Sequence, residues 1–418
     1  MLTVYKSELK LKKNGSTMKR LAAIASVYIF SICLMLYGCA GENENNEALH
    51  MNSIDGNNEF IYVGTFAGDE SEGLYVFAFN RQNGTMSHLQ TVSNRQGPNF
   101  QAIHPNKQFL YTVSGDRFSE DEPYGTLSAY RIDQETGMLE LMNEQSVQGR
   151  GVAHVSVDPL GEFVYVSNYS EGNVVVFRVR DDGSVTEAVG SAYHEGSSVN
   201  ERRQRAAHVH SVIPSADGRF IYVSDLGIDQ IRIYEINRET GELSPAQTPY
   251  FANEPGAGPR HFVIHSNGRY AYSVEELTVT VAALRVDPET GALEQIERYS
   301  MLPEGVEPDD SMTAADIHIS PDGRFLYASN RGGGQDIIAI YEIDTESGEL
   351  SVVGHESTRG GHPRNFMVDE QGEYLLVANR DGNHVVIFRR DQETGLLEFS
   401  GNEASVPLAV CVTQLILE

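Results

Sequence analysis

A short phrase recurs seven times along the chain, and this repeat constrains the fold more than any other feature. Each copy has a Gly-containing turn, an apolar run, a second apolar run and a hairpin signal of the Glu-Thr-Gly kind. The copies are aligned by anchors at Tyr62, Tyr111, Tyr165, Tyr222, Tyr272, Tyr327 and Leu376. Their spacing, roughly 40 to 50 residues or slightly more, is that of a four-stranded propeller blade. The sequence therefore predicts an all-β fold, a seven-bladed β-propeller whose closed ring buries the faces that a single blade leaves open.

The fifth repeat shows the strands of one blade most clearly. Alternation of apolar and polar residues predicts strands over 260–265, 270–274 and 279–286, with a fourth strand starting at Leu293. Asn267-Gly268 and Thr290-Gly291 are hairpin signals between these strands. The second turn recurs at Asn83-Gly84, Thr136-Gly137, Asp182-Gly183, Thr240-Gly241, Ser347-Gly348 and Thr394-Gly395. We expect a positive φ at each of these glycines, because glycine adopts that conformation without a Cβ clash.

The two ends of the repeat region indicate how the ring closes. The first repeat begins at Phe60-Ile61-Tyr62, which is a second-strand phrase without a first strand before it. The segment 408–416 has the pattern of a first strand and no second strand after it. We therefore expect the C-terminal segment to supply the inner strand of the first blade. The propeller domain, residues 59–418, then has no open sheet edge between its ends.

The first 58 residues do not carry the repeat. Lys19-Arg20 precedes an apolar run over 21–36 that ends in Tyr37-Gly38-Cys39, and this pattern is typical of a bacterial lipoprotein signal. A transmembrane anchor is the alternative, but the run is short for a membrane span. We expect residues 1–38 to be an N-terminal extension with a cleaved signal peptide, Cys39 to carry the lipid, and residues 39–58 to form a flexible tether. The protein is then exported to the periplasm or cell surface and meets the membrane only through this anchor; without a working signal it is cytoplasmic.

The charge balance argues against one large class of partners. The chain has 31 basic and 59 acidic residues, a net charge of −28, and removal of residues 1–38, with six basic residues and one acidic residue, makes it −33. A nucleic acid is therefore not an expected partner. Cys39 and Cys411 lie outside the signal, so we expect no disulfide once Cys39 is acylated, and no Cys-His spacing typical of zinc occurs. We expect a monomer without a metal or other cofactor.

Propeller topology brings polar residues from several repeats to one end of the ring. In an up-and-down blade, the start of the first strand and the end of the second strand lie on the same face, beside the central channel. Residues at these positions are His154 with Asn168 and Tyr169, His208 and His210 with Asp225, Arg260 with Glu275 and Glu276, Asp316 and His318 with Asn330 and Arg331, and Arg364 with Arg380. We expect these groups, which can transfer protons and bind anions, to share one rim.

Several basic residues also have a structural interpretation. A histidine inside an apolar strand is more often a hydrogen-bonded core residue than a catalytic one, and this applies to His154, His265 and His318. The arginines of the Gly-Arg turns fall on the opposite face, where we expect them to cap blades: Arg219, Arg269 and Arg324. Arg260 and Arg331 differ from these, because several arginines around one funnel of an acidic protein favour anion binding there.

Four phrases near this rim resemble the seven-bladed lactonase family. They are Gly258-Pro259-Arg260-His261, Glu276-Leu277, the run 321–332 with its Ser329-Asn330-Arg331-Gly332 phrase, and Pro363-Arg364-Asn365-Phe366. The resemblance covers about residues 60–417. The family contains the propeller-type 6-phosphogluconolactonases and a fungal carboxy-muconate lactonizing enzyme. The resemblance implies hydrolysis or formation of a lactone that carries an acidic group.

The resemblance also implies a set of site residues. The histidine, two arginines and glutamate proposed for the lactonizing branch correspond to His208 or His210, Arg260, Arg331 and Glu276. The chain departs from the family pattern in having Ala207 before the two histidines, where proline is common, and Glu275 where asparagine is common. Glu275 is therefore a second carboxylate that can alter the pKa of the expected base. Arg364, His154 and Asn330 complete the expected substrate-binding set.

Hydrolysis of a sugar lactone needs an oriented water, a base and a donor for the developing oxyanion. Glu276 or a rim histidine can act as the base and Arg260 as the donor, while Arg331 and Arg364 clamp a phosphate or carboxylate. The chain has no Gly-x-Ser-x-Gly phrase, so a covalent serine mechanism is not expected.

Three functions compete on this basis. The first is hydrolysis of an anionic sugar lactone. Phosphogluconolactone arises in the cytoplasm, whereas we expect this chain to be exported. An unphosphorylated aldonolactone or uronic lactone is therefore an alternative substrate. The second is a propeller that binds a ligand or partner without chemistry, because the fold itself carries none. The third is a lactone-forming cycloisomerase of the muconate type. Turnover of lactones distinguishes the first function from the second.

Overall fold

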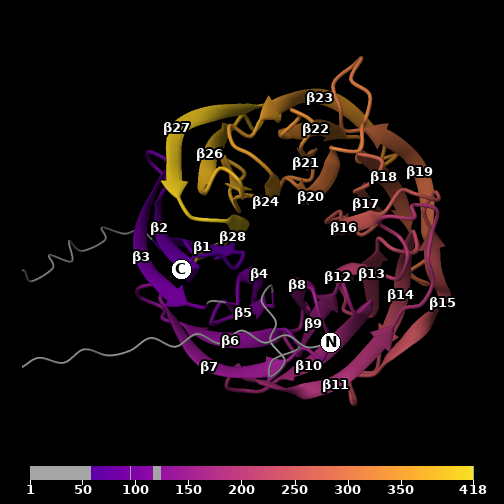
Figure 1. Cartoon of the computed structure of the whole chain (residues 1–418), viewed down its shortest axis with the longest axis horizontal. Helices are drawn as coiled ribbons and strands as arrows, with labels where there is room; N and C mark the ends of the chain where they lie inside the picture. Colours follow the sequence, from indigo (N-terminus) through magenta and orange to yellow (C-terminus); the bar gives the residue numbers. More distant parts are fainter. Residues whose placement is uncertain (1–57, 95, 116–123, 418) are drawn as a thin grey trace, which may run out of the picture. The chain divides into compact units, whose positions relative to one another are not determined.

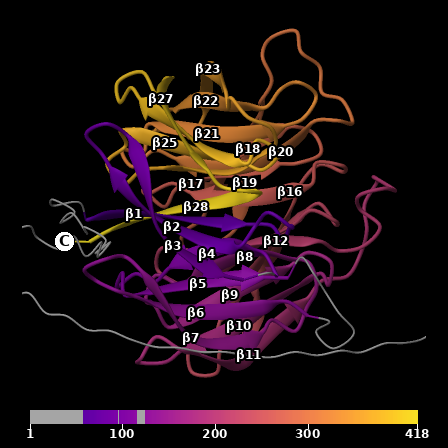
Figure 2. The ribbon, with the colours of Figure 1, turned by 60° about the vertical axis from the view of Figure 1, so that its left-hand side comes forward.

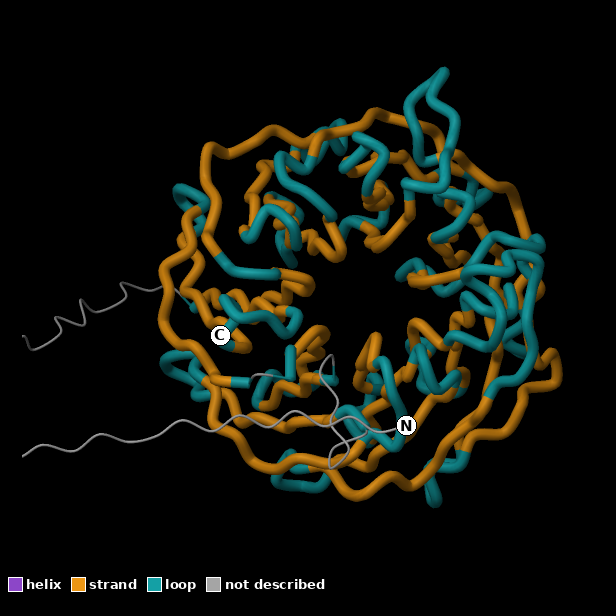
Figure 3. The backbone as a smooth tube through the Cα atoms, viewed as in Figure 1, coloured by secondary structure: helices purple, strands orange, loops and turns teal. Residues whose placement is uncertain are grey.

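The computed structural model describes residues 58–94, 96–115 and 124–417. These residues form seven four-stranded antiparallel sheets arranged as a ring (Figure 1). The seven-bladed propeller predicted from the repeat is therefore confirmed, and its described elements are strands and loops (Figure 3). Within these ranges, no helix has the length and apolar character needed to cross a membrane. The expected lipid site at Cys39, the signal peptide and residues 39–57 of the expected tether lie outside the described residues.

Each blade has an inner strand beside the central axis and a second strand next to it. The inner strands are β4 (Pro98–Ile103), β8 (Val152–Val157), β12 (Val209–Pro214), β16 (Pro259–Ile264), β20 (Thr313–Ile319), β24 (Pro363–Val368) and β28 (Ala409–Ile416). The second strands are β1 (Glu59–Thr65), β5 (Phe109–Ser114), β9 (Phe163–Asn168), β13 (Phe220–Asp225), β17 (Tyr270–Glu275), β21 (Phe325–Arg331) and β25 (Tyr374–Asn379).

Two further strands complete each blade toward the outside of the ring. The third strands are β2 (Gly73–Asn80), β6 (Thr126–Ile132), β10 (Asn173–Val179), β14 (Gln230–Ile236), β18 (Thr280–Val286), β22 (Ile337–Ile343) and β26 (His384–Arg390). The outer strands are β3 (Thr85–Ser93), β7 (Leu139–Ser146), β11 (Val185–Tyr193), β15 (Leu243–Ala252), β19 (Leu293–Ser300), β23 (Leu350–Ser357) and β27 (Leu397–Ser405). The strand bounds predicted for the fifth repeat differ from those of β16 to β19 by at most one residue.

The hydrophobic core lies between neighbouring blades. Every residue of β9, β13 and β17 is buried, whereas the outer strands β11 and β15 expose part of their length. Successive residues of a strand point to opposite faces of the sheet. A strand that is buried at every position must therefore pack against a blade on each side, which is what a closed ring provides.

The repeated tyrosine of the second strand bonds its blade to the next one in five of the seven blades. The hydroxyl of Tyr62 donates to the carbonyl of Gly137 at 2.8 Å, and Tyr272 contacts Gly348 in the same way at 3.1 Å. The contact recurs from Tyr111 to Gly183, from Tyr222 to Gly291 and from Tyr327 to Gly395. The seventh repeat has Leu376 at this position, and Tyr374 donates instead to the carbonyl of Arg81 at 2.7 Å. Five of the seven anchors that revealed the repeat thus form bonds between blades, whereas the hydroxyl of Tyr165 has no hydrogen-bond partner among the described residues.

The glycines of the turns between the third and outer strands have the expected conformation and a second role. Gly137 has φ of 67° and Gly348 has φ of 80°, and the equivalent glycines of the other five blades are also positive. A Cβ atom on Gly137 would lie 2.4 Å from ring atoms of Phe60, which belongs to the preceding blade. Glycine is therefore required both by the turn and by the close approach of the neighbouring blade.

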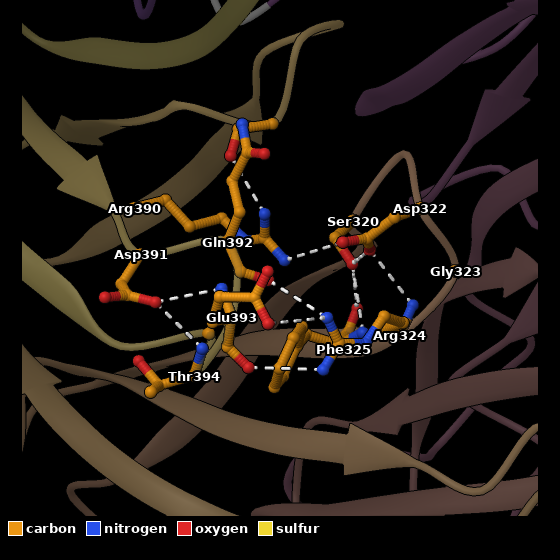
Figure 4. Close-up of polar contacts among 12 residues, drawn as sticks. Ser320, Asp322, Gly323, Arg324, Phe325, Arg390, Asp391, Gln392, Glu393 and Thr394 are labelled. Atoms are coloured by element: carbon orange, nitrogen blue, oxygen red, sulfur yellow. Dashed lines mark hydrogen bonds and ion pairs between the residues drawn. The ribbon is translucent and has the colours of Figure 1, made fainter.

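The Gly-Arg turns hold blades together on the face opposite the candidate site. In Figure 4, Arg324 donates to the carbonyls of Gln392 at 3.3 Å and Glu393 at 3.2 Å, and Asp322 accepts from its backbone nitrogen at 3.1 Å. Arg219 and Arg269 make the same kind of contact with Glu289 and Thr345 of their neighbouring blades. The capping role predicted for these arginines is confirmed.

The ring closes as predicted from its ends. The C-terminal strand β28 lies beside β1 in Figures 1 and 2, and the antiparallel pairs run from Glu59 with Ile416 to Thr65 with Ala409. β28 also contains Cys411, which is reduced and buried. Burial raises the pKa of its thiol to about 12, so this cysteine is a core residue without thiolate chemistry.

Candidate functional site

Three arginines surround the carboxylate of Glu276 on one face of the ring. Its Oε2 atom is 3.0 Å from Nε of Arg260 and 3.3 Å from Nη2 of Arg331. Its Oε1 atom accepts a hydrogen bond from Nη2 of Arg203. The Glu276 side chain is only 6% exposed. The cluster of Glu276, Arg203, Arg260 and Arg331, here called the arginine cluster, therefore carries surplus positive charge within a strongly acidic protein.

A β-bulge places Arg260 in this cluster. β16 pairs with β17 on both sides of Arg260, but Arg260 itself is the additional, unpaired residue. A bulge changes the direction of the side chain at the extra position. Arg260 is buried, and its Nη1 donates to the carbonyl of Ala315 in the next blade. Bulges at the equivalent positions of β12 and β24 leave His210 and Arg364 unpaired in the same way.

The backbone of two blades fixes Glu276. Its nitrogen donates to the carbonyl of Gly258 at 2.8 Å, and its own carbonyl accepts from the nitrogen of Ala314 at 3.1 Å. Glu276 directly follows Glu275, the last residue of β17, so the strand positions its backbone although Glu276 is not part of the strand. The carboxylate is thereby set between the inner strands β16 and β20.

The neighbouring carboxylate, Glu275, is turned away from the arginine cluster. It is fully buried and forms an ion pair with Arg298 at 2.7 Å, with further hydrogen bonds from Asn253 at 2.8 Å and Thr280 at 2.6 Å. Successive side chains of a strand alternate in direction. Glu275 is therefore a structural carboxylate inside the blade, and Glu276 is the one that faces the arginines.

The same alternation separates Asn330 from Arg331 in the sixth blade. Asn330 is buried and donates to the carbonyl of Gln335 at 2.7 Å, which holds the loop that follows β21. Arg331 reaches Glu276 and also donates to the carbonyl of Ala314 at 3.0 Å. Asn330 therefore supports the loop beside Arg331 and is not a member of the arginine cluster.

Burial and charge act in opposite directions on Glu276. Burial alone raises the pKa of its carboxyl, but Arg331, Arg260 and Arg203 lower it by more, to about 2. Burial, together with the charges of Arg331 and Arg364, lowers the pKa of Arg260 well below its usual range. Glu276 is thus ionised at neutral pH. While all three arginines hold it, it is a weak base, because a general base works best with a pKa near the working pH.

A hydrogen-bonded group that includes His261 supports Arg260 from the channel side. Nδ1 of His261 lies 2.6 Å from Oδ1 of Asp316, and the other oxygen of Asp316 binds Nε2 of His318 at 2.9 Å and the amide of Asn365 at 2.6 Å. Because the carboxylate is an acceptor, His261 carries its proton on Nδ1. Its Nε2 lone pair then faces Nη1 of Arg260 at 3.3 Å. Burial and the charge of Arg260 lower the pKa of His261 to about 4, so this imidazole is neutral at pH 7.

The two further predicted histidines, His154 and His210, lie against His261. Their ring centroids are 5.5 Å and 5.2 Å from that of His261. Burial lowers the pKa of both well below the usual range, with a further contribution from His261 for His154 and from Arg260 for His210. In the described part of the chain, Nδ1 of each has no hydrogen-bond partner. Both are therefore neutral groups that are able to bind a polar ligand atom.

His208 is less buried and has a defined tautomer. Its ring stacks on Tyr169 with centroids 4.3 Å apart, and its Nδ1 lies 3.0 Å from the backbone carbonyl of Tyr169. A carbonyl only accepts hydrogen bonds, so Nδ1 carries the proton and Nε2 keeps its lone pair. His208 is therefore a possible proton acceptor near the cluster, since Tyr169 also contacts Arg203 at 3.5 Å.

Arg364 contributes charge to the site without pairing with Glu276. Its guanidinium lies 4.8 Å from the ring centroid of Phe66, and its charge contributes to the lowered pKa of Arg260. His362 lies between this region and the cluster, with Nε2 at 3.5 Å from Nη1 of Arg331. The predicted arginines Arg260, Arg331 and Arg364 are therefore near one another.

Sequence reasoning missed Arg203. This residue lies in the loop 194–208 between β11 and β12, and not at the start or end of a predicted strand. The available signal was the run Arg202-Arg203-Gln204-Arg205, which is basic in an otherwise acidic chain. The run alone does not indicate which arginine turns toward Glu276.

A cavity of about 640 Å³ follows the central channel next to the arginine cluster. Its lining includes His154, His261, Asp316, His318 and Asn365, but none of the four residues of the cluster. It extends to His265, which bonds the carbonyl of Gly323 at 2.9 Å and accepts from the nitrogen of Asn267, so the structural role expected for this histidine is confirmed. Among the described residues, no group of three or more His, Cys, Asp or Glu is arranged to hold a metal ion.

Comparison with known proteins agrees with this architecture. The family described as "Lactonase, 7-bladed beta-propeller" matches residues 60–414. A 6-phosphogluconolactonase of Formosa agariphila is 38% identical over 340 residues, which cover 81% of this chain and 94% of the relative. A 6-phosphogluconolactonase of Bacillus subtilis is 36% identical over 351 residues, or 84% of this chain and 97% of the relative. The structure of a periplasmic gluconolactonase from Pseudomonas aeruginosa is similar with a TM-score of 0.81 and 29% identity, covering 86% of this chain and 99% of that one.

Proposed function

Because the chain belongs to the seven-bladed β-propeller lactonase family, we propose that it hydrolyses a sugar-acid lactone to the open acid. The observation that carries this proposal is the arginine cluster: one ionised carboxylate, Glu276, is held next to the channel cavity by more positive charge than it can neutralise. Surplus buried charge of this kind favours an anionic substrate. The relatives named as 6-phosphogluconolactonases and the periplasmic gluconolactonase support a lactone of an aldonic acid as the substrate class.

The proposed reaction needs one proton acceptor and one oxyanion donor. Glu276 takes a proton from a water molecule, and the resulting hydroxide attacks the carbonyl carbon of the lactone. Arg260 stabilises the oxyanion that forms, since its guanidinium is fixed by Ala315 and His261 before substrate arrives. The ring C–O bond then breaks, and the ring oxygen leaves as a hydroxyl after taking a proton. His208 and His210 are the candidates to deliver that proton or to replace Glu276 as the base.

The proposed substrate clamp consists of Arg331 and Arg364. Arg331 can donate to a carboxylate or phosphate through Nη1, whose contact with His362 is 3.5 Å long, and Arg364 adds a second charge nearby. His154 is proposed to bind a hydroxyl of the sugar, because it is neutral and its Nδ1 has no partner in the described residues. All residues proposed for this site come from one chain, and we propose that the protein acts as a monomer.

A panel of lactones tests the proposal together with one variant. We expect the protein to hydrolyse 6-phosphogluconolactone or gluconolactone faster than the spontaneous reaction. Arg331→Ala should raise KM for the acidic lactone by about 10- to 100-fold, because it removes a charge-assisted hydrogen bond of about 1.5–3 kcal/mol. KM for the neutral lactone should change much less. Arg219→Ala, which removes an exposed arginine on the opposite face, is the control and should leave both KM values unchanged. Equal effects of Arg331→Ala on both lactones would argue against the clamp.

The proposed location is outside the cytoplasm, on a lipid anchor. The lipoprotein-like segment that ends at Cys39 supports this, as does the periplasmic location given for the Pseudomonas aeruginosa relative. Export favours an unphosphorylated lactone from extracellular sugar oxidation, and the surplus positive charge of the arginine cluster favours one that carries a carboxylate.

The anchor makes a separate prediction about Cys39. In a bacterial host, Cys39→Ser should abolish incorporation of labelled fatty acid and release the protein from the membrane fraction, because the acylated sulfur is lost. The Cys411→Ser variant is the matched control and should still be labelled, since Cys411 is buried in β28. Continued labelling of the Cys39→Ser protein would contradict the assignment.

A further inference from the structure

The two oxygens of Glu276 are held unequally. Oε2 faces two arginines, Arg260 at 3.0 Å and Arg331 at 3.3 Å. Oε1 is bound by Arg203. Release of Arg203 would therefore free one oxygen of the carboxylate, while the other oxygen stays paired.

Arg203 is also the most accessible of the three arginines. Its side chain is 31% exposed, whereas those of Arg260 and Arg331 are 1% and 5% exposed. Arg260 is held by the carbonyl of Ala315, and Arg331 by that of Ala314 at 3.0 Å. The further side-chain bond of Arg203, to the hydroxyl of Tyr169, is 3.5 Å long. Its guanidinium can therefore turn toward an incoming anion at lower cost than the other two.

The backbone beside Arg203 is anchored. The neighbouring Gln204 is buried and donates to the carbonyl of Leu226 and to Asp229, both at 2.8 Å, and its own nitrogen donates to Asn200 at 2.8 Å. A movement of Arg203 is therefore confined to its side chain and does not require the loop 194–208 to unfold.

We propose that Arg203 is a switchable positioning residue: in the resting protein it holds Oε1 of Glu276, and the anionic group of the bound lactone draws it away, so that this oxygen can take the proton of the attacking water. This inference rests on the proposed lactonase function. Oε1 of Glu276 stays bound to Arg203 until an acidic lactone binds. A neutral lactone does not release Arg203, so acidic lactones are favoured in the catalytic step as well as in binding.

Release of Arg203 changes the pKa of Glu276, and with it the pH dependence of activity, in a defined direction. The charged and titratable groups that face Glu276 are Arg203 from the loop, Arg260 from β16, Arg331 from β21 and Tyr169 after β9. An arginine within about 4–6 Å lowers the pKa of a carboxyl by about 1–3 units. Loss of Arg203 from Oε1 must therefore raise the pKa of Glu276. Activity that needs the ionised carboxylate is then lost at a higher pH as the solution is acidified.

Arg203→Gln tests this through two pH profiles. The profile of kcat/KM reports the free enzyme, and that of kcat reports the substrate complex. In Arg203→Gln, the acidic limb of kcat/KM should move up by about 1–3 pH units. The acidic limb of kcat should stay where it is, because Arg203 has already left Glu276 in the parent complex. Arg205→Gln, an exposed arginine of the same loop, is the matched control and should move neither limb. A shift of both limbs, or of neither, would overturn the switch.

A binding experiment separates this inference from the proposed function. Titration calorimetry of 6-phosphogluconate near pH 4.5, in buffers of different ionisation enthalpy, measures proton uptake on binding. The parent should take up more protons than Glu276→Gln, since release of Arg203 raises the pKa of Glu276, and the excess should shrink in Arg203→Gln. Equal uptake by the parent and Glu276→Gln, or no binding at all, would contradict the switch. A protein that shows the excess uptake but hydrolyses no lactone would retain the switch and lose the proposed function.

Discussion

Replacing Glu276 by glutamine is expected to reduce lactone turnover by about 10²- to 10⁴-fold, which is the usual cost of losing a general base. The amide is nearly isosteric with the carboxylate but cannot take a proton from water. Affinity for the open acid should be retained or increase, because the negative charge that competes for Arg203, Arg260 and Arg331 is removed. Steady-state rates and calorimetry on the same preparation measure both effects.

Two further variants control for the loss of a buried charge. Glu276→Gln leaves Arg260 and Arg331 without their carboxylate, and an unpaired buried charge can destabilise the fold. Glu276→Asp keeps the charge but withdraws the carboxylate, so turnover should still fall while the melting temperature changes less. Glu275→Gln makes the same chemical change at the adjacent residue, which is paired with Arg298 inside the blade. It should lower stability but leave the turnover of the folded protein near that of the parent. If only His208→Gln abolishes turnover, the base is His208.

Deletion of residues 408–418 is expected to remove most of the stability of the propeller. The deletion takes away β28, in which Val410, Val412 and Leu415 are buried and which pairs with β1 at every residue except Val410. Burial of a Val or Leu side chain contributes about 1.5–3 kcal/mol. The loss is thus comparable with the roughly 5–15 kcal/mol that separates folded from unfolded states in typical domains. It also exposes an edge of β1 that can pair with other chains.

Thermal unfolding and gel filtration measure the effect of this deletion. The truncated protein should melt far below the parent or be aggregated. Addition of a peptide with the sequence 408–418 should restore part of the stability, because the missing strand is supplied from outside. An unchanged melting temperature would contradict the role of β28 in closing the ring.

Much of the fold could be predicted because its determinants are local and repeated. The Gly anchor recurs in every blade and the Tyr anchor in six of the seven, and the structure shows why: the hydroxyl of Tyr62 or Tyr272 donates to the carbonyl of a tight Gly turn in the next blade. The strand-one pattern of 408–416 and the missing first strand before Phe60 were enough to predict the closure.

The site was less predictable, because position in a strand does not give side-chain direction where bulges occur. Alternation could have distinguished Glu276 from Glu275 and Arg331 from Asn330, since each pair lies at the end of a second strand. The direction of Arg260 depends on a bulge in β16, and the pairing of Arg203 depends on how a loop between blades folds. No local sequence pattern predicts the direction of Arg260 or the pairing of Arg203. The family resemblance indicates site residues only within the motifs that carry it, and Arg203 lies outside them.

The most direct test of the account is the rate at which the purified protein accelerates hydrolysis of 6-phosphogluconolactone and gluconolactone, measured as acid release above the spontaneous rate in parallel with Glu276→Gln. The account predicts enzyme-dependent hydrolysis of at least one of these lactones and its loss in the variant. Binding of the acidic sugars without any acceleration would contradict it, and would identify the protein as a ligand-binding propeller.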